Sequence, residues 1–364
     1  MNEQLRALLR PELADMAAYV PAEPAGIRVR LDANEAAPPS SSALRDAVSR
    51  AIAGVAMERY PDARAMALKQ AIATRTGAKP EEILVGTGSD EVISLALNAL
   101  ARPRPKLPQA VVLSPTPTFV MYRVTARVHG MKSLEVPLDA SWDLDVGATK
   151  AAIDAVQPSI VFIASPNNPT GNRMSEARLA HVIESAAGAF VVLDEAYVDY
   201  ASGSLRGWRD RYPHLGILRT LSKVGLAALR VGWLEADAEL VREIDKGRQP
   251  FNVSATSQAA ASAVLLEAWP AVQAEVGAIV HERTRVAEEI GRMPGLSVTP
   301  SDANFLWVKT ARPARDVYEG LVKRGVLVRS FHATGGRLAN QLRVTIGRAV
   351  DNDALLSALK ECVG

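Results

Sequence analysis

The 364-residue sequence has little of several things that define other protein classes. It has one cysteine, Cys362, which excludes a disulfide framework and a metal site built from cysteines and fits a reducing compartment. Its 42 Lys and Arg against 40 Asp and Glu leave a formal net charge of +2. That balance argues against nucleic acid or an anionic membrane as the partner.

Long apolar runs are also missing from the sequence. No window of about twenty residues lacks charged or polar breaks, so we expect no membrane span. Residues 1–10 carry two arginines and no apolar run typical of a signal peptide. Hydrophobic residues make up 48% of the chain, enough to bury a large core. We therefore expect a cytoplasmic protein without internal repeats or low-complexity segments.

Strand and helix patterns alternate through the first two thirds of the chain. Apolar runs predict strands at 83–85, 110–113, 133–137, 159–164, 189–193, 215–219 and 231–234. Helical spacing predicts helices at 41–57, 63–76, 92–101, 119–128, 148–156 and 175–187. Such alternation is typical of an α/β fold with a mostly parallel sheet sandwiched by helices. In this fold ligands bind beyond the carboxyl ends of the strands.

The remainder of the chain has a different pattern. Strands are expected at 297–299, 304–308, 326–329 and 341–346, with helices at 269–292, 314–324 and 351–362, which indicates a smaller α+β domain. We predict a proline-rich N-terminal arm at 1–40, with a brief strand at 27–31, packing on the small domain or a partner subunit. The large domain is predicted at 41–264 and the small domain at 265–364.

The segment 218–230 contains a lysine in an unusual place. Lys223 follows an apolar strand, and lysine is seldom placed in apolar surroundings without a chemical role. The hydroxyls of Thr220 and Ser222 and the guanidinium of Arg230 can bind a phosphate. A lysine that forms an imine with a phosphate-bearing aldehyde needs these groups close together.

Other polar clusters also follow predicted strands. A glycine-rich turn leads to Ser89 and Asp90, whose amides at a helix start favour an anion, although a plain helix cap fits the turn equally well. Asp194 ends a buried strand and could pair with a protonated pyridine nitrogen or simply cap a helix. Tyr197 and Asn168 could contact the oxygen of the same ring, although the segment 167–171 also reads as an ordinary turn.

With these motifs the sequence resembles the pyridoxal-phosphate-dependent aminotransferases of fold type I, in the histidinol-phosphate aminotransferase family. The resemblance covers nearly the whole chain in family order. The segments that carry it are Leu31-Asp32-Ala33-Asn34-Glu35, Arg59-Tyr60-Pro61-Asp62, Gly88-Ser89-Asp90-Glu91, Pro117-Thr118-Phe119, Pro166-Asn167-Asn168-Pro169-Thr170-Gly171, Asp194-Glu195-Ala196-Tyr197, Arg219-Thr220-Leu221-Ser222-Lys223, Asn304-Phe305 and Leu342-Arg343-Val344-Thr345-Ile346-Gly347.

The resemblance implies a role for each of these residues. Lys223 would carry pyridoxal 5'-phosphate as a Schiff base and act as general acid/base. Asp194 would pair with the pyridine nitrogen, and Asn168 and Tyr197 with the ring oxygen. Phe119 would stack on the ring. The phosphate would be held by the groups Ser89, Asp90, Thr220, Ser222 and Arg230, and by Tyr60 from the other subunit of a homodimer with shared active sites.

For the substrate, the resemblance points to Arg343, assisted by Arg329, Tyr19 and Asn34. A guanidinium can bind the phosphate of histidinol phosphate or a carboxylate of glutamate in the same way, so one site can serve both substrates. The alternative for Arg343 is a surface ion pair. The implied reaction exchanges the amino group between L-histidinol phosphate and 2-oxoglutarate, giving imidazole-acetol phosphate and glutamate, as in histidine biosynthesis.

The sequence departs from the family pattern at three places. Phe119 stands where tyrosine is usual, one residue fewer separates Lys223 from Arg230, and the asparagine-proline that commonly follows Glu35 is missing. Related enzymes of the same fold remain open as alternatives, namely an aminotransferase for aromatic or other amino acids and a decarboxylase of a phosphorylated amino acid. A non-catalytic regulator would need a DNA-binding module, and the residues before Leu31 are too few and too rich in proline for one.

Overall fold

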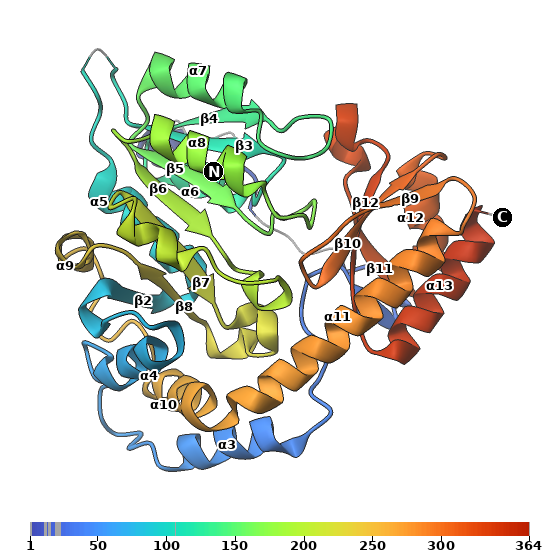
Figure 1. Ribbon diagram of the computed structural model, residues 1–364, viewed down its shortest axis with the longest axis horizontal. Coiled ribbons are helices and arrows are strands. Elements are labelled where there is room, and N and C mark those ends of the chain that lie inside the picture. The colour runs from blue at the N-terminus through green and yellow to red at the C-terminus, as the bar shows by residue number, and fades with distance from the viewer. Residues whose placement is uncertain (1, 11–12, 14–15, 19–22, 106, 364) are drawn as a thin grey trace.

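The computed structural model of the protein describes residues 2–10, 13, 16–18, 23–105 and 107–363. Its strands form two sheets, which lie side by side in Figure 1. The seven-stranded sheet has the order β2-β8-β7-β6-β5-β3-β4, and the five-stranded sheet has the order β1-β11-β12-β10-β9.

The strands of the larger sheet lie close to the predicted ranges. They are β2 (Ile83–Thr87), β3 (Val111–Thr116), β4 (Lys132–Pro137), β5 (Ile160–Ala164), β6 (Phe190–Asp194), β7 (Leu215–Thr220) and β8 (Val231–Glu235). The strands of the smaller sheet are β1 (Val29–Leu31), β9 (Leu296–Thr299), β10 (Phe305–Thr310), β11 (Val326–Ser330) and β12 (Gln341–Thr345).

The described helices include every helix predicted above. In the first half they are α1 (Glu3–Ala7), α3 (Ser42–Ala53), α4 (Met66–Thr76), α5 (Gly88–Leu100), α6 (Met121–Val128), α7 (Val146–Val156) and α8 (Glu176–Ser185). In the second half they are α9 (Ala238–Asp245), α10 (Ala255–Ala263), α11 (Trp269–Gly291), α12 (Ala314–Lys323) and α13 (Ala349–Val363).

Helices cover both faces of the seven-stranded sheet because its strands alternate their side chains between two cores. Phe162 of β5 packs in the core with α5 and α6, whereas the next residue, Ile163, packs in the core with α7 and α8. In this sheet β8 runs opposite to the other six strands, which all point the same way. The predicted α/β fold with a mostly parallel sheet between helices is confirmed.

The five-stranded sheet combines distant parts of the chain. β1 pairs in parallel with β11, while the β11–β12, β12–β10 and β10–β9 pairs are antiparallel. The end of the predicted N-terminal arm is therefore a strand of this sheet. The division into an arm and two domains at residues 40 and 264 stays a prediction.

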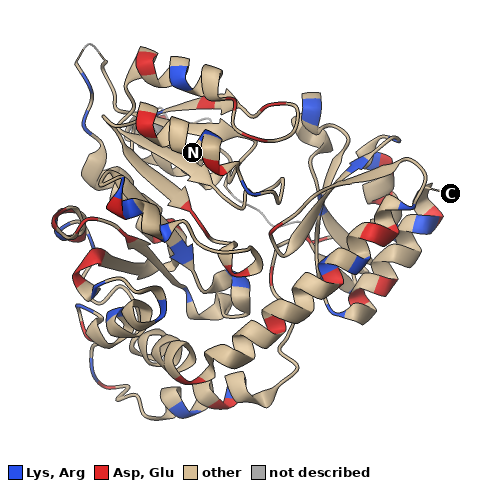
Figure 2. Cartoon of the chain, viewed as in Figure 1, with Lys and Arg blue, Asp and Glu red and all other residues tan. Residues whose placement is uncertain are grey.

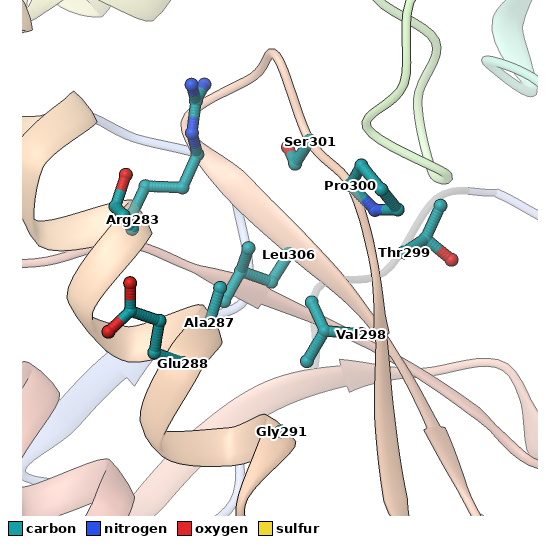
Figure 3. A pocket seen from close by; sticks show the side chains of 10 residues that line it. Arg283, Ala287, Glu288, Gly291, Val298, Thr299, Pro300, Ser301 and Leu306 are labelled. Atoms are coloured by element: carbon teal, nitrogen blue, oxygen red, sulfur yellow. The ribbon is translucent and has the colours of Figure 1, made fainter.

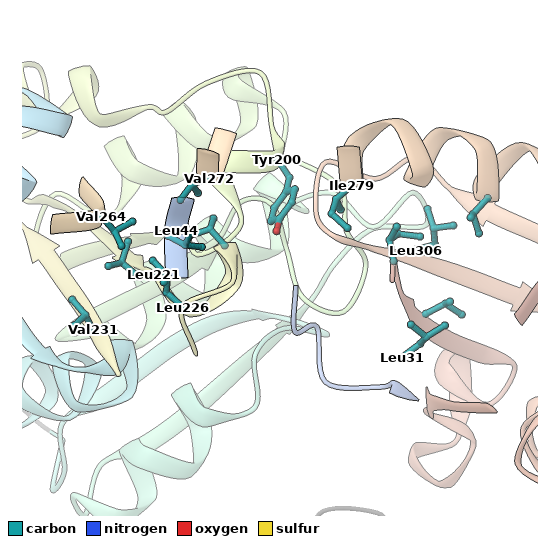
Figure 4. Close-up of a cluster of buried hydrophobic side chains, with 14 of the residues drawn as sticks. Leu31, Leu44, Tyr200, Leu221, Leu226, Val231, Val264, Val272, Ile279 and Leu306 are labelled. Atoms are coloured by element: carbon teal, nitrogen blue, oxygen red, sulfur yellow. The ribbon is translucent and has the colours of Figure 1, made fainter. Parts of the chain in front are cut away.

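One hydrophobic core continues from the larger sheet into the smaller one. Figure 4 shows its side chains from Val231 of β8, through Tyr200, to Ile279 of α11 and Leu31 of β1. The long helix α11 runs between the two sheets (Figure 1). By length and composition alone the helical stretch Ala255–Gly291 could span a membrane, but buried residues along it, such as Val272 and Ile279, pack in this core.

Two details differ from the expectations. The helix α5 begins at Gly88 rather than at residue 92, because Gly88 adopts φ +79 and continues directly from β2 into the helix. The helix α1 was not predicted. On the elements visible in Figure 2, basic and acidic residues are interspersed, as the balanced composition suggested.

Candidate active site

The carboxyl ends of neighbouring parallel strands bring the predicted polar residues to one edge of the larger sheet. β5 ends at Ala164, just before the turn that carries Asn168, and β6 ends at Asp194 itself. β7 ends at Thr220, three residues before Lys223. Because these strands run in the same direction, residues far apart in sequence meet here.

Asp194 is buried and held by two hydrogen bonds. The Tyr122 hydroxyl donates to one carboxylate oxygen at 2.5 Å, and the Ala196 amide donates to the other at 2.9 Å. Burial raises the pKa of Asp194 to about 6, while the hydrogen bonds from Tyr122 and Ala196 act in the opposite direction. A cation at this position would stabilise the ionised carboxylate.

Tyr122 is a site residue that the sequence reasoning missed. It is fully buried in α6, and its ring stacks on Phe162 with the centroids 4.6 Å apart. The available signal was its spacing three residues after Phe119, which is compatible with one face of a helix. The two rings do touch edge to face, 5.6 Å apart.

Lys223 lies in a tight turn after β7. Its ammonium nitrogen is 5.7 Å from the centre of the Tyr197 ring, and its backbone carbonyl accepts a 2.6 Å hydrogen bond from Tyr200. The side chain is half-buried, so it is open to a ligand. Gly225 follows with φ +91, a left-handed conformation that closes the turn and suits glycine.

The predicted phosphate-binding groups gather beside this turn. The helix α5 starts at Gly88 without a side-chain cap, so its first amides, including those of Ser89 and Asp90, are available for an anion. The Thr220 hydroxyl lies 3.0 Å from the Ser222 hydroxyl oxygen. Arg230 completes the group, with a guanidinium nitrogen 3.6 Å from a carboxylate oxygen of Asp90.

Two glycines make this close approach possible. A Cβ on Gly88 would lie 2.6 Å from a guanidinium nitrogen of Arg230. A Cβ on Gly232 would lie 2.3 Å from the backbone nitrogen of Ser89, so α5 can rest on β8 only if that position has no side chain. The uncapped helix start, two hydroxyls and an arginine together fit a phosphate monoester.

A second group of buried polar residues surrounds Tyr197. The side chain of Asn34 donates to the Tyr197 hydroxyl at 2.9 Å, and the Asn304 side chain donates to the Asn34 carbonyl at 3.0 Å. Thr345 accepts from the Asn34 amide at 3.0 Å. Asn304 and Thr345 lie in the motif segments of the sequence, but their sequence positions alone gave no role to either side chain.

Arg343 joins the two sheets at the site. Its guanidinium donates to the side-chain oxygen of Asn168 at 2.7 Å and also to the backbone carbonyl of Asp32. Arg329 lies directly opposite Arg343 in the β11–β12 pair and is exposed. The interpretation of Arg343 as an outward-facing residue in a surface ion pair is therefore not needed.

The two asparagines in the turn after β5 make different contacts. Asn167 is buried and donates to the Pro117 carbonyl and the Thr170 hydroxyl, at 2.9 and 2.8 Å. These bonds hold the turn. Asn168, in contrast, is half-buried, and no bond from its amide nitrogen to another described residue is present.

Tyr60, one of the predicted residues, lies on the surface. Tyr60 is 81% exposed and stacks on Phe251 with ring centroids 4.7 Å apart. Tyr19 lies outside the described residues.

A hollow of about 410 Å³ lies elsewhere, between α11 and β9 (Figure 3). Its lining includes Arg283, Ser301 and Leu306, and none of the predicted site residues. Arg283 donates to the Ala303 carbonyl at 2.8 Å, so the hollow lies behind the loop that packs on Tyr197. The predicted polar groups converge at the strand ends and not at this hollow.

Comparison with known proteins gives consistent matches over almost the whole chain. The sequence profile of the family described as "Aminotransferase class I and II" matches residues 27–359. Histidinol-phosphate aminotransferase 1 of Ralstonia nicotianae is 37% identical, covering 98% of this chain and 95% of that protein. The histidinol-phosphate aminotransferase of Chromobacterium violaceum is 38% identical, covering 99% of each.

The fold also has close counterparts among solved structures. The histidinol-phosphate aminotransferase from Sinorhizobium meliloti, in complex with pyridoxal-5'-phosphate, superposes with a TM-score of 0.85, covering 98% of both chains at 24% identity. A putative aminotransferase from Burkholderia pseudomallei has a TM-score of 0.78 at 27% identity, covering 93% of this chain and 100% of the other.

Proposed function

The chain belongs to the class I and II aminotransferases, and within them to the histidinol-phosphate aminotransferase family, and from this we propose that it transfers the amino group of L-histidinol phosphate to 2-oxoglutarate. The products are imidazole-acetol phosphate and glutamate, in histidine biosynthesis. The family resemblance read from the motifs is confirmed, and with it the prediction that the protein is a pyridoxal-phosphate-dependent enzyme.

The residues at the strand ends fit pyridoxal 5'-phosphate. The uncapped start of α5, with Ser222 and Arg230, suits its phosphate. Because Gly88 and Gly232 have no side chains, α5, β8 and Arg230 can lie close together. Asp194 suits its pyridinium nitrogen, since burial raises the pKa of this carboxyl to about 6 and a cation would lower it. Phe119 is assigned to the face of the ring.

Two hydrogen-bond donors suit the ring oxygen. Tyr197 accepts a hydrogen bond from Asn34, so its own hydroxyl proton is left to donate. Asn168 accepts from Arg343 through its oxygen, so its NH₂ group is left to donate. Both residues therefore present donors, as a phenolic oxygen of the cofactor requires.

Lys223 is the residue that holds the cofactor covalently and moves the proton. When bound, pyridoxal phosphate supplies an aldehyde for an amine and a ring that stabilises negative charge on the substrate carbon. The Lys223 amine, on its half-buried side chain next to Tyr197, would take a proton from that carbon and deliver it to the carbon that was the aldehyde of the cofactor. The short turn at Gly225 keeps the amine near the end of β7.

Arg343 is assigned to the substrate anion. Its bond to Asn168 is the observation that carries the proposal, because it connects a guanidinium to a residue assigned to the cofactor. An anion bound by Arg343 is therefore next to the ring oxygen. Phosphate and carboxylate both accept two parallel hydrogen bonds from a guanidinium, so Arg343 can bind histidinol phosphate and glutamate in turn. Arg329, Asn34 and Tyr19 are assigned supporting roles.

We also infer a cytoplasmic homodimer in which Tyr60 reaches the phosphate of the partner subunit's site. Tyr60, Met57, Met66 and Phe251 are exposed apolar or aromatic side chains, and their burial against a second copy would be favourable. The loop containing Phe251 continues into Asn252, whose carbonyl accepts from Thr87 at 2.8 Å beside the start of α5.

A half-reaction assay tests the function. The cofactor-loaded enzyme is mixed separately with histidinol phosphate, phenylalanine and threonine phosphate, and the visible absorbance of the bound cofactor is followed. We expect the fastest change with histidinol phosphate. A faster change with phenylalanine would indicate an aromatic aminotransferase, and release of carbon dioxide from threonine phosphate would indicate a decarboxylase.

A further inference from the structure

The side chains of Tyr122 and Asp194 are both buried and are hydrogen-bonded to each other. The Tyr122 hydroxyl donates to Asp194 at 2.5 Å, and Tyr122 lies on α6, three residues after Phe119. The ring is clamped between two others, stacked on Phe162 and edge-on to Phe119. The hydroxyl is therefore held in a fixed position by packing.

Tyr122 can act only as a donor in this position. Burial, followed by the negative charge of Asp194, raises its pKa well above the usual value, so the phenol keeps its proton at any pH at which the enzyme works. The second oxygen of Asp194 is already held by the Ala196 amide. Both oxygens therefore accept one fixed hydrogen bond, and the carboxylate cannot turn.

We infer that Tyr122 is a positioning residue that keeps Asp194 ionised and oriented toward the cofactor's ring nitrogen, and so sets how tightly the cofactor is retained. The inference rests on the proposed function. Without the phenol, Asp194 would be buried with one donor fewer, and its proton affinity would rise. The neutral acid no longer attracts a pyridinium, so cofactor binding would weaken first at acidic pH.

Other titratable groups lie near Asp194 or Tyr122 and must be kept constant in a test. They are Asp90 of α5, Tyr197 after β6 and Lys223 after β7. Tyr122→Phe alters none of them, and it keeps the ring that packs on Phe162.

The test is cofactor affinity as a function of pH, measured by equilibrium dialysis. For Tyr122→Phe we expect the affinity to fall about tenfold to hundredfold near neutral pH, the range for losing a hydrogen bond to a charged group. The acidic limb of the affinity curve, which starts at the pKa of Asp194 in the free protein, moves to higher pH. The matched control is Tyr212→Phe, which removes a buried phenol that donates to Glu184 at 2.8 Å, away from the strand ends.

A double-mutant experiment with Asp194→Asn shows whether Tyr122 acts through Asp194 or through a general effect on the structure. In an Asp194→Asn background, adding Tyr122→Phe should change the affinity by less than about twofold, since the charge that the phenol stabilises is gone. Equal affinity and an unmoved acidic limb in Tyr122→Phe would overturn the inference, as would an undiminished effect in the Asp194→Asn background.

A second substitution keeps the inference testable if Tyr122→Phe does not fold. With 3-fluorotyrosine at position 122 the hydroxyl remains and is a stronger donor, so the acidic limb should move to lower pH, and an unmoved or raised limb overturns the inference. Borohydride reduction of the wild-type protein, followed by peptide mapping, shows independently whether the cofactor is attached at Lys223. Failure of that attachment would refute the proposed function, whereas a normal attachment with no effect at position 122 would refute only this inference.

Discussion

The two sheets contribute to the site in different ways. The carboxyl edge of the seven-stranded sheet offers buried groups whose positions are fixed by short local connections, such as Asp194 with Ala196 or Thr220 with Ser222. The five-stranded sheet offers Arg343 and Arg329, two adjacent cations, of which Arg329 is exposed. The first arrangement suits a permanent cofactor, and the second suits two substrates that must enter and leave in turn.

Residues between the two sheets link the groups assigned to the cofactor with those assigned to the substrate. Asn34 follows β1 of the smaller sheet and donates to Tyr197 of the larger one, and Arg343 of β12 donates to Asn168. Substitutions in the larger sheet should therefore affect chemistry with every substrate, substitutions in the smaller sheet should affect substrate binding, and substitutions between them should have mixed, smaller effects.

The largest effect is expected for Lys223→Ala. Removal of the amine eliminates both the covalent attachment and the proton transfer, so transamination should fall by roughly 10³-fold or more with every amino donor. Steady-state assays with histidinol phosphate and with glutamate measure this. Lys246→Ala, at an exposed ion pair with Glu243, is the control and should keep full activity. Residual activity near that of the wild type would contradict the role of Lys223.

Asp194→Asn should lower activity by about 10²- to 10³-fold, the range for losing a preorganised charge at a reacting group. The same substitution should also raise the free energy of unfolding at neutral and alkaline pH. Because the pKa of Asp194 in the folded, cofactor-free protein is about 6, above the ordinary 3.8, its contribution to stability is complete at acidic pH and is lost as the pH rises through 6.

The cost of ionising this buried carboxyl is up to about 3 kcal/mol by pH 8. Urea unfolding of the cofactor-free proteins at pH 5 and pH 8 measures about half of this cost, because the unfolded carboxyl is already ionised at pH 5. The wild type should lose more stability than Asp194→Asn over this interval. Equal losses in the two proteins would show that the carboxyl is not strained by its burial.

Arg343→Ala tests the smaller sheet. We expect kcat/KM to fall about 100-fold for both histidinol phosphate and glutamate, mainly through KM, because a bidentate charged contact is lost. Arg343→Lys should recover only part of it, since an ammonium lacks the planar fork. Arg348→Ala, at the exposed Arg348–Asp351 pair, is the control. A loss confined to one of the two substrates would refute the shared anion site.

The smallest effects are expected between the sheets, at Asn34. Its φ of +56 suits asparagine or glycine but strains alanine. Asn34→Gly removes the side-chain hydrogen bonds to Tyr197 and from Thr345 and should lower kcat by about fivefold to tenfold. Asn34→Ala should add a loss of stability of about 1 kcal/mol, visible in thermal unfolding. Identical stability of the two variants would argue against strain at this position.

Much of this organisation could be predicted from the sequence because it is local. Short apolar runs predicted the strands of the parallel sheet, and the strand ends then indicated Asp194, Asn168 and Lys223 as neighbours. The start of α5 was placed four residues too late, because the glycine that begins the helix reads equally well as part of a turn.

Only the tertiary structure decided which side chains form hydrogen bonds with one another. Tyr122 and Asp194 are 72 residues apart, Asn34 and Tyr197 are 163 apart, and Arg343 and Asn168 are 175 apart. Periodicity and turn signals in the sequence do not predict such pairs, because the two partners meet only after both sheets have formed and α6 has packed. The sequence determined the cofactor chemistry and the family, through residue types at strand ends. Folding determined how each of those groups is oriented and held.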